Sequence, residues 1–163
     1  MAQPGVVNLI VLEGINDIGW PQIKPRPLQD GTTPKKSSFA NEVVSAEDLI
    51  AGLQHQLIER APQHGIRVFA ATLTPYEGAE YYSADGETTR QAVNRWIRTS
   101  GAFDGVFDFD AAVRDPKYPA QFREGYHSGD HLHPSATGYA AMANAVDLSA
   151  LRSVGGTGTK SIH

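Results

Sequence analysis

The sequence contains no cysteine, which excludes disulfide bonds and thiolate metal sites. It has no apolar run long enough to span a membrane. Its first residues, MAQPGVVNLI, lack the basic and apolar regions of a secretory signal. Basic residues are not in excess: the net charge is −4, which argues against a protein that binds nucleic acid phosphates. What is left is a globular chain of 163 residues, 40% hydrophobic, which is enough for one domain.

Three short apolar segments alternate with helical patterns along the chain. The apolar segments are residues 6–14 (VVNLIVLEG), 65–75 (GIRVFAATLTP) and 105–110 (GVFDFD). The first is almost continuous in valine, isoleucine and leucine, which favours a strand buried on both faces. Amphipathic patterns at 45–61 and 87–101 predict two helices between the strands, and a third helix follows the cap residue Ser135. This order is typical of an α/β fold with a parallel sheet covered by helices.

The expected domain organisation is simple. Residues 1–151 are predicted to form a single domain, and the tail at 152–163 is predicted to be disordered. The segment at 20–41 is rich in proline and polar residues and is too long for an ordinary connection, so we expect a long surface loop there. On the last helix, the side facing the core is predicted to carry Tyr139, Met142 and Val146.

Two polar clusters occupy places where ligands collect in parallel sheets, beyond the carboxyl ends of strands. Gly-Ile-Asn-Asp at 14–17 follows the first predicted strand, and Asp-His-Leu-His at 130–133 precedes the last helix. They resemble Gly-x-Asn-Asp and Asp-x-x-His, the third and fifth signature blocks of the SGNH hydrolases, also called the GDSL esterase/lipase superfamily. The resemblance extends from Val6 to Leu148. It implies the flavodoxin-like fold of that family, a three-layer α/β/α sandwich.

The resemblance also implies a function and roles for three residues. His133 would be the general base in the hydrolysis of a carboxylic ester, because an imidazole titrates near neutral pH. Asp130 would accept the other ring N–H of this histidine and orient it. Asn16 would donate its side-chain amide to the oxyanion of the transition state. No cofactor is expected, and the substrate would be a small-molecule or carbohydrate ester, such as an acetyl ester.

Aromatic residues in the predicted loops are candidates for contacts with this substrate. We assign that role to Trp20 and Tyr76, although loop aromatics more often fill gaps in a core. The polar clusters also have plainer interpretations. His133 would then bond a backbone carbonyl at the helix entry, and Asn16 and Asp17 would only form a turn.

The first two blocks of the family, which carry the nucleophilic serine and an oxyanion-hole glycine, have no counterpart here. No serine precedes Asn16, and the first serine in the sequence is Ser37. We therefore expect the amino-terminal strands of the fold to be missing and the chain to be inactive or weakly active. Loss of the first strand would expose the edge of the strand at 6–13. We expect the chain to pair with a second copy through that edge, to swap an element or to be marginally stable.

Two other functions stay open at this point. One is a metal-dependent hydrolase whose ligands would come from a single cluster: His127, Asp130, His131 and His133. This cluster lacks an obvious distant ligand, and we assign no metal. The other is a remnant or binding module without chemistry. The sequence does not assign a compartment.

Overall fold

A parallel sheet of three strands forms the centre of the molecule. The structure, a computed structural model, describes residues 4–23 and 42–152. Its strands are β1 (Asn8–Val11), β2 (Arg67–Ala71) and β3 (Gly105–Phe107), in the spatial order β1-β2-β3. Ile10 lies opposite Phe69, and Ala70 lies opposite Val106.

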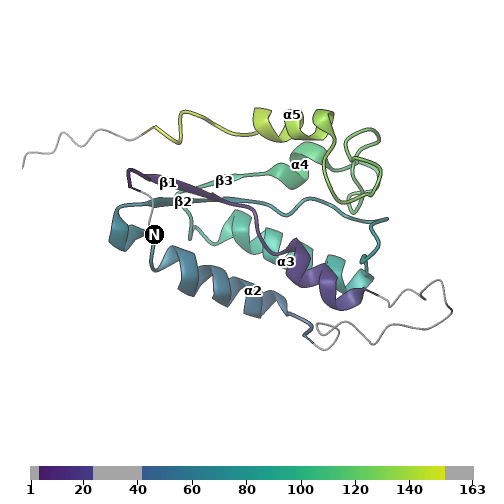
Figure 1. Ribbon diagram of the computed structural model, residues 1–163, viewed down its shortest axis with the longest axis horizontal. Coiled ribbons are helices and arrows are strands. Elements are labelled where there is room, and N and C mark those ends of the chain that lie inside the picture. Colours follow the sequence, from purple (N-terminus) through teal and green to yellow (C-terminus); the bar gives the residue numbers. More distant parts are fainter. Residues whose placement is uncertain (1–3, 24–41, 153–163) are drawn as a thin grey trace, which may run out of the picture.

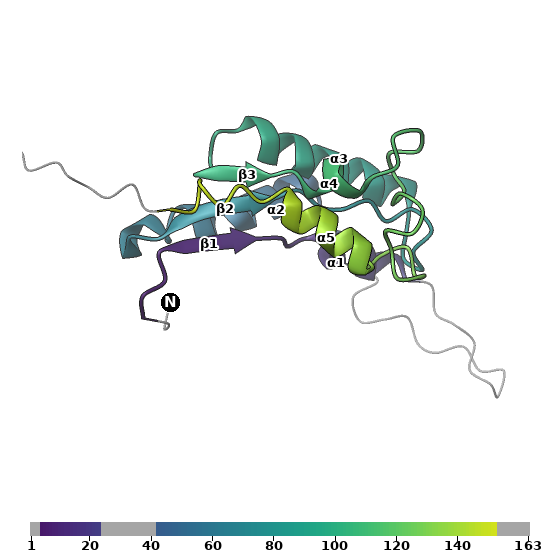
Figure 2. The ribbon, with the colours of Figure 1, turned by 90° about the horizontal axis from the view of Figure 1, so that it is seen from above.

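Helices cover both faces of this sheet. Their bounds are α1 Ile15–Gly19, α2 Ala46–Leu53, α3 Ala84–Thr99, α4 Phe109–Val113 and α5 Ala136–Asn144. In Figure 1, α4 and α5 lie above the strands and α2 and α3 lie below them. Figure 2 shows α1, α4 and α5 gathered at the arrowhead end of the strands, which is their carboxyl end. The predicted α/β class, with a parallel sheet between two helical layers, is confirmed.

The strands are shorter than the apolar segments predict, because the chain turns soon after each strand. Gly14 has φ 121°, a conformation that side chains with a Cβ rarely adopt, and α1 begins directly after it. After β3, the carboxylate of Asp108 accepts a hydrogen bond from the backbone N–H of Ala111 and caps α4. Apolar composition predicts where a strand lies, but these turn signals decide where it ends.

The predicted helices differ from the observed ones mainly at their ends. The helix expected at 45–61 is α-helical only to Leu53 and continues as a π-helical turn, Gln54–Ile58, followed by a 3-10 turn, Pro62–His64. The helix expected at 87–101 begins earlier, at Ala84, because the hydroxyl of Ser83 accepts a hydrogen bond from Gly86 N–H.

Both cap residues predicted from the sequence are present. Ser45 and Asp48 form a capping box, in which each side chain accepts a hydrogen bond from the other's backbone N–H. Ser135 caps α5. The prediction for Tyr139 was wrong: its side chain is 56% exposed, because Gly138 and Met142 form the buried side of that helix.

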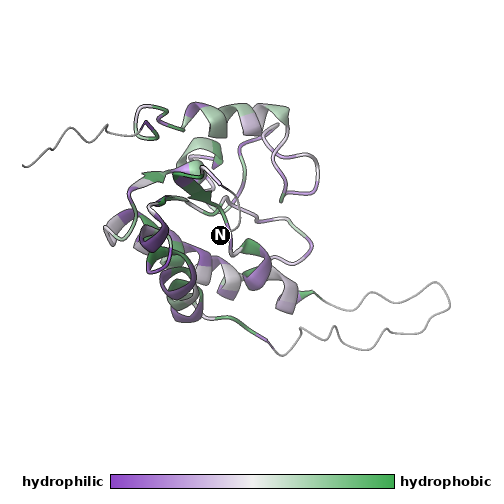
Figure 3. Cartoon of the chain, turned by 60° about the vertical axis from the view of Figure 1, so that its left-hand side comes forward, coloured by the Kyte–Doolittle hydropathy of each residue, from purple (hydrophilic) through white to green (hydrophobic). Residues whose placement is uncertain are grey.

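The core lies on both sides of the sheet, and in Figure 3 the hydrophobic residues concentrate on the strands and on the helix faces turned toward them. Ala70 of β2 packs with Val93 and Ile97 between the sheet and α3. On the opposite face, Phe69 and Phe107 stack with ring centroids 5.6 Å apart, within a cluster that contacts α4 and α5. Alternate residues of β2 therefore anchor different layers.

Some predicted features fall largely outside the described residues. Of the expected loop at 20–41, the structure describes residues 20–23, where Trp20–Gln22 forms a 3-10 helix. Of the expected tail at 152–163, it describes Arg152 alone. Among the described helices, none combines the length and the apolar composition that crossing a membrane requires.

A buried arginine on α3 connects the carboxyl ends of β2 and β3. The guanidinium of Arg90 is fully buried and donates to the Leu73 carbonyl and to the Asp110 carboxylate, each at 2.8 Å. It also pairs with Glu87, one turn earlier on α3. Burial alone would lower the pKa of Arg90, but hydrogen bonds to Glu87 and Asp110 outweigh this effect and raise it. The cation is therefore held in the core by paired carboxylates.

The second oxygen of Asp110 and the carboxylate of Asp108 are also paired. Arg98 and Arg114 donate to the second oxygen of Asp110, at 2.6 and 2.8 Å. Arg98 also binds Asp108. Burial works to raise the pKa of Asp108, but hydrogen bonds from Arg98, Ala111 and Thr72 lower it to about 2. Asn94 completes the connection, since its amide exchanges two hydrogen bonds with the backbone of Leu73.

We predict that Asp110→Ala lowers the free energy of unfolding by about 3–5 kcal/mol, because it leaves the buried cation of Arg90 with one carboxylate partner fewer. Urea denaturation followed by circular dichroism measures this loss. The control is Glu59→Ala, which removes an exposed ion pair with His55 and should change stability little. Equal effects of the two substitutions would contradict a structural role for the buried pair.

The outer edge of β1 has no strand partner among the described residues. The carbonyl of Val7 accepts from Arg67 N–H, so alternation along a parallel strand directs the backbone groups of Asn8 and Ile10 away from β2. Four apolar side chains in this part of the chain are exposed: Val6, Val7, Ile10 and Leu12. No charged residue lies between Gly5 and Leu12 to discourage pairing with another strand.

We therefore predict that the chain self-associates in a concentration-dependent way and that Ile10→Lys weakens this association. A lysine at the edge would place a charge where a second strand must pack. Size-exclusion chromatography with light scattering measures the effect. Val43→Lys is the matched control, because Val43 is apolar and 69% exposed but lies outside the sheet. A monomeric wild-type protein at all concentrations, or an equal effect of both substitutions, would refute the prediction.

Candidate active site

The loop before α5 brings Asp130 and His133 into direct contact. Nδ1 of His133 lies 2.6 Å from Oδ2 of Asp130. The other carboxylate oxygen accepts the backbone N–H groups of Leu132 and His133, both at 2.9 Å. One carboxylate therefore shapes the turn and also holds the imidazole that the turn presents. Since Nδ1 faces a carboxylate, it carries the proton, and Nε2 is left as the basic nitrogen.

Asp130 stays ionised in this arrangement. The hydrogen bond from the His133 side chain, which is the largest effect, lowers the pKa of Asp130 well below its usual range. Burial is the next largest effect and opposes the first, while the backbone N–H groups of His133 and Leu132 and the hydroxyl of Ser128 also lower the pKa. A permanent negative charge next to the ring favours the imidazolium that forms when His133 accepts a proton.

The two neighbouring histidines, His127 and His131, stabilise the conformation of the loop. Nδ1 of His127 accepts hydrogen bonds from the backbone N–H groups of Gly129 and His131. The rings of His127 and His131 stack with centroids 4.1 Å apart, and His131 has φ 59°. Within residues 4–23 and 42–152, no group of three or more histidine, aspartate or glutamate side chains is arranged to hold a metal ion. The alternative of a metal ligand cluster in this loop is therefore without a geometric basis.

Asn16 lies at the start of α1, two residues after the Gly14 turn. Its side-chain oxygen accepts a hydrogen bond of 2.9 Å from the hydroxyl of Tyr81, a residue that is 6% exposed. No other described residue hydrogen-bonds to its amide group, so the amide N–H groups have no protein acceptor there. This side chain can donate to a negatively charged oxygen.

Asn16 and His133 line one cavity of about 210 Å³ at the carboxyl end of the sheet. Its walls come from the ends of β1 and β2, from α1 and from the loop before α5. The remaining lining residues are Leu12, Ile15, Leu73, Thr74, Tyr81, Leu132, Pro134, Tyr139 and Met142. A mostly apolar cavity with a base and an amide donor suits a small acyl group with a polar reacting centre.

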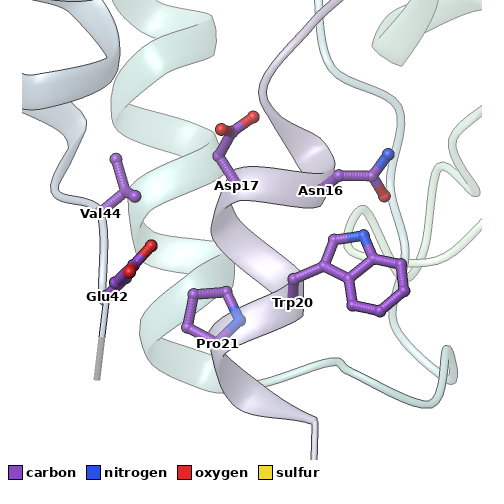
Figure 4. Close-up of a pocket in the computed structure, with 6 residues that line it drawn as sticks. All are labelled: Asn16, Asp17, Trp20, Pro21, Glu42 and Val44. Atoms are coloured by element: carbon purple, nitrogen blue, oxygen red, sulfur yellow. The ribbon is translucent and has the colours of Figure 1, made fainter. Parts of the chain in front are cut away.

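A second pocket of about 340 Å³ adjoins this cavity and shares Asn16 with it. It is lined by Asn16, Asp17, Trp20, Pro21, Glu42 and Val44. Figure 4 shows the Asn16 and Trp20 side chains on one side of α1, with the indole below the amide, and Asp17 on another side of the helix. Trp20 is 49% exposed and therefore presents a large apolar surface next to the candidate oxyanion donor.

Comparison with known proteins identifies the family of the chain. Residues 2–141 match the model of the GDSL-like Lipase/Acylhydrolase family. The chain belongs to this family. The resemblance seen in the two signature blocks is therefore confirmed, and in this GDSL-like chain Asn16 of one block and His133 of the other line the same cavity. No protein of curated function matches it closely enough to count as a relative.

A solved structure supports the fold of this GDSL-like chain. A Bacteroides fragilis protein that its name assigns to the acylhydrolases matches with a TM-score of 0.58 and 16% sequence identity. The alignment covers 89% of this chain but 61% of the other protein, so the chain spans less than two thirds of that protein's length. At this level of identity the match shows a shared fold.

The structure does not place Tyr76 where the sequence analysis expects it. Tyr76 is fully buried, packs against Tyr81 and Tyr82, and lines neither pocket. Burial is the main reason that its pKa is raised to about 12. We therefore withdraw Tyr76 as a substrate contact, and of the two aromatic candidates only Trp20 faces a pocket.

No serine lines the cavity that holds Asn16 and His133; its hydroxyl groups belong to Thr74, Tyr81 and Tyr139. The serines in the described part of the chain serve local structure. Ser45, Ser83 and Ser135 cap helices, Ser128 binds Asp130, Ser100 accepts from Ala102 N–H, and Ser149 binds Asp147. The base thus has no serine partner among these residues.

Sequence reasoning missed several residues of the cavity. Thr74 follows β2 by a few residues, and its position beyond the carboxyl end of a strand was a usable signal. Tyr139 and Met142 stand three residues apart on α5, so they share a helix face, but only the folded chain shows that the cavity lies beside it. Nothing in the sequence pairs Tyr81 with Asn16, 65 positions away.

We predict that His133→Ala raises the pKa of Asp130 toward its ordinary value, because the substitution removes the main hydrogen bond that lowers it. Carboxyl carbon NMR across an acid titration measures the shift. Asp147, whose pKa is lowered by Ser149, is the internal control and should not move. Since a depressed pKa stabilises the fold above the unfolded value, the wild-type protein should retain this contribution to lower pH than the variant. An unchanged titration of Asp130 would contradict the role of the ring.

Proposed function

We propose that this site is built to hydrolyse carboxylic esters, with His133 as the base, Asp130 as the residue that orients it and Asn16 as the oxyanion donor. The observation that carries the proposal is the 2.6 Å contact between His133 and Asp130 in a loop whose histidine shares a cavity with Asn16. Membership of the GDSL-like Lipase/Acylhydrolase family supports the same reaction type.

The base and the oxyanion donor of the proposed reaction both line the cavity. Nε2 of His133 takes the proton of an attacking hydroxyl, whose oxygen forms a bond to the ester carbonyl carbon. The negative charge that develops on the carbonyl oxygen is stabilised by the amide N–H of Asn16. His133 then returns the proton to the leaving alkoxide as the ester bond breaks, and the anion of Asp130 stabilises the intermediate imidazolium.

The attacking oxygen is the part that the described residues do not supply as a serine. We propose that this chain is therefore inactive or weakly active on its own and that water attacks activated esters slowly with help from His133. A base and part of an oxyanion hole retain some rate enhancement when a nucleophile is lost.

For the substrate, we propose an ester of a small acyl group, such as acetyl, on a carbohydrate or another small alcohol. The acyl group would occupy the cavity of about 210 Å³, and the alcohol would lie against Trp20 in the adjoining pocket. Asp17 and Glu42 are the charged groups among the described lining residues of that pocket. They disfavour an anionic alcohol and can accept hydrogen bonds from hydroxyl groups.

Hydrolysis of p-nitrophenyl acetate by purified variants tests the proposal. We predict that His133→Ala reduces turnover to the rate of the buffer. Asn16→Ala should lower the His133-dependent rate by about 10²–10³-fold, the usual loss for one oxyanion donor. The control is His55→Ala, since His55 is an exposed histidine paired with Glu59 on the far turn after α2. Equal rates, both above that of the buffer, for the wild type and His133→Ala would reject ester hydrolysis by this site.

A fluorophosphonate probe distinguishes attack by water from attack by a hydroxyl group of the protein. After exposure to the probe, intact mass and peptide mapping show whether a hydroxyl group has been modified. No adduct supports a site that acts through water. A stoichiometric adduct that disappears in His133→Ala would contradict the predicted weak activity and would locate the nucleophile. Turnover no faster than the buffer in every variant would instead favour a binding module without chemistry.

A further inference from the structure

The orientation of the Asn16 amide determines whether it can donate a hydrogen bond to an anion in the cavity. Its nitrogen donates hydrogen bonds and its oxygen only accepts them, so a rotation by half a turn replaces the donor by a lone pair. Facing the reacting carbonyl, the oxygen would repel the charge that the nitrogen would stabilise. Some contact must therefore select one orientation.

Tyr81 supplies that contact. Its hydroxyl lies 2.9 Å from Oδ1 of Asn16, and its side chain lines the cavity at Asn16 and is almost fully buried. A phenol has a single proton to donate, and among the described residues Asn16 is its one hydrogen-bond partner. If the amide were reversed, its nitrogen would donate to the phenol oxygen and the phenol proton would be left without an acceptor. An unpaired buried donor is unfavourable, so the observed orientation is selected.

Two further features keep this phenol in place and protonated. Gly19 on α1 lies so close to Tyr81 that a Cβ at that position would come within 2.2 Å of the ring, so only glycine allows this approach. Burial, and then the charge of Asp130, raise the pKa of Tyr81 to about 12. The proton is therefore present at every pH at which an imidazole base works.

We propose that Tyr81 is a positioning residue that directs the Asn16 amide nitrogen into the cavity by donating its hydroxyl proton to the amide oxygen. This inference rests on the proposed function, and Tyr81 acts through Asn16 without touching the reacting atoms. The charge of Asp130, in the other signature block, also acts on this hydroxyl and helps to raise its pKa.

The substitution Tyr81→Phe removes the proton donor and keeps the ring. With p-nitrophenyl acetate, kcat should fall about tenfold, which is less than the loss of the whole donor, while KM stays unchanged. The decrease should be constant between about pH 6 and pH 10, since the phenol does not ionise there. Tyr82→Phe is the matched control. Tyr82 also packs on Tyr76, but the structure shows no hydrogen bond from it to Asn16.

A double-mutant cycle tests whether Tyr81 affects kcat through Asn16. In the Asn16→Ala background, Tyr81→Phe should have no further effect on kcat, because the amide that it orients is gone. A tenfold loss that persists in this background, or a wild-type kcat in Tyr81→Phe beside a strong dependence on His133, would overturn the inference while leaving the proposed function intact. Absence of any dependence on His133 would instead mean that the proposed function had failed.

Nitrogen-15 NMR of the Asn16 side chain tests the orientation without turnover. In the wild-type protein, the amide protons should give one sharp pair of resonances. Tyr81→Phe should shift and broaden them, because both orientations become populated, and Tyr82→Phe should leave them unchanged. Thermal denaturation of both variants shows whether they fold equally well. An unaltered amide spectrum in a folded Tyr81→Phe protein would overturn the inference.

Discussion

The ion pair between Arg90 and Asp110 is the interaction on which the rest of the structure depends. Both side chains are completely buried, and the same guanidinium also binds the Leu73 carbonyl just beyond β2. A buried charge is tolerated only when it is paired and its donors are satisfied. The requirement couples the layers of the sandwich, because α3 cannot pack on the sheet unless the segment after β2 and the start of α4 meet it in one geometry.

This coupling also determines where the candidate catalytic groups lie. Leu73, whose backbone is held by Arg90 and Asn94, and the next residue, Thr74, form part of the cavity that contains Asn16 and His133. The short loops at the carboxyl ends of the strands are therefore fixed by buried ion pairs and hydrogen bonds. Within the loop before α5, a single carboxylate has two functions, since Asp130 closes the turn and holds the ring. Local stability and the orientation of the base are thus consequences of the same contact.

The candidate base and amide are well organised, whereas the edge of the sheet is open. His133 is bound by an ionised carboxylate and Asn16 by a buried phenol, yet Ile10 on the edge strand β1 and Leu12 just after it are exposed. The groups proposed to polarise a carbonyl are held by buried or ionic contacts, whereas the outer edge of β1 is apolar and has no strand partner among the described residues. The organised base and amide support the proposal of ester hydrolysis, and the lack of a serine among the described residues that line the cavity supports the proposal of weak activity.

The sequence by itself determined the fold class, the caps at Ser45 and Ser135, and the two blocks that contain Asn16 and Asp130–His133, because each depends on residues close together in the chain. The spacing of three between Asp130 and His133 allowed a tight turn to bring them into contact, as the structure shows. Tertiary structure decided the rest. It buried Tyr76, exposed Tyr139, placed Arg90 between two strand ends and brought Tyr81 to Asn16. These outcomes depend on which faces of distant elements meet, and no local pattern of residues encodes that pairing.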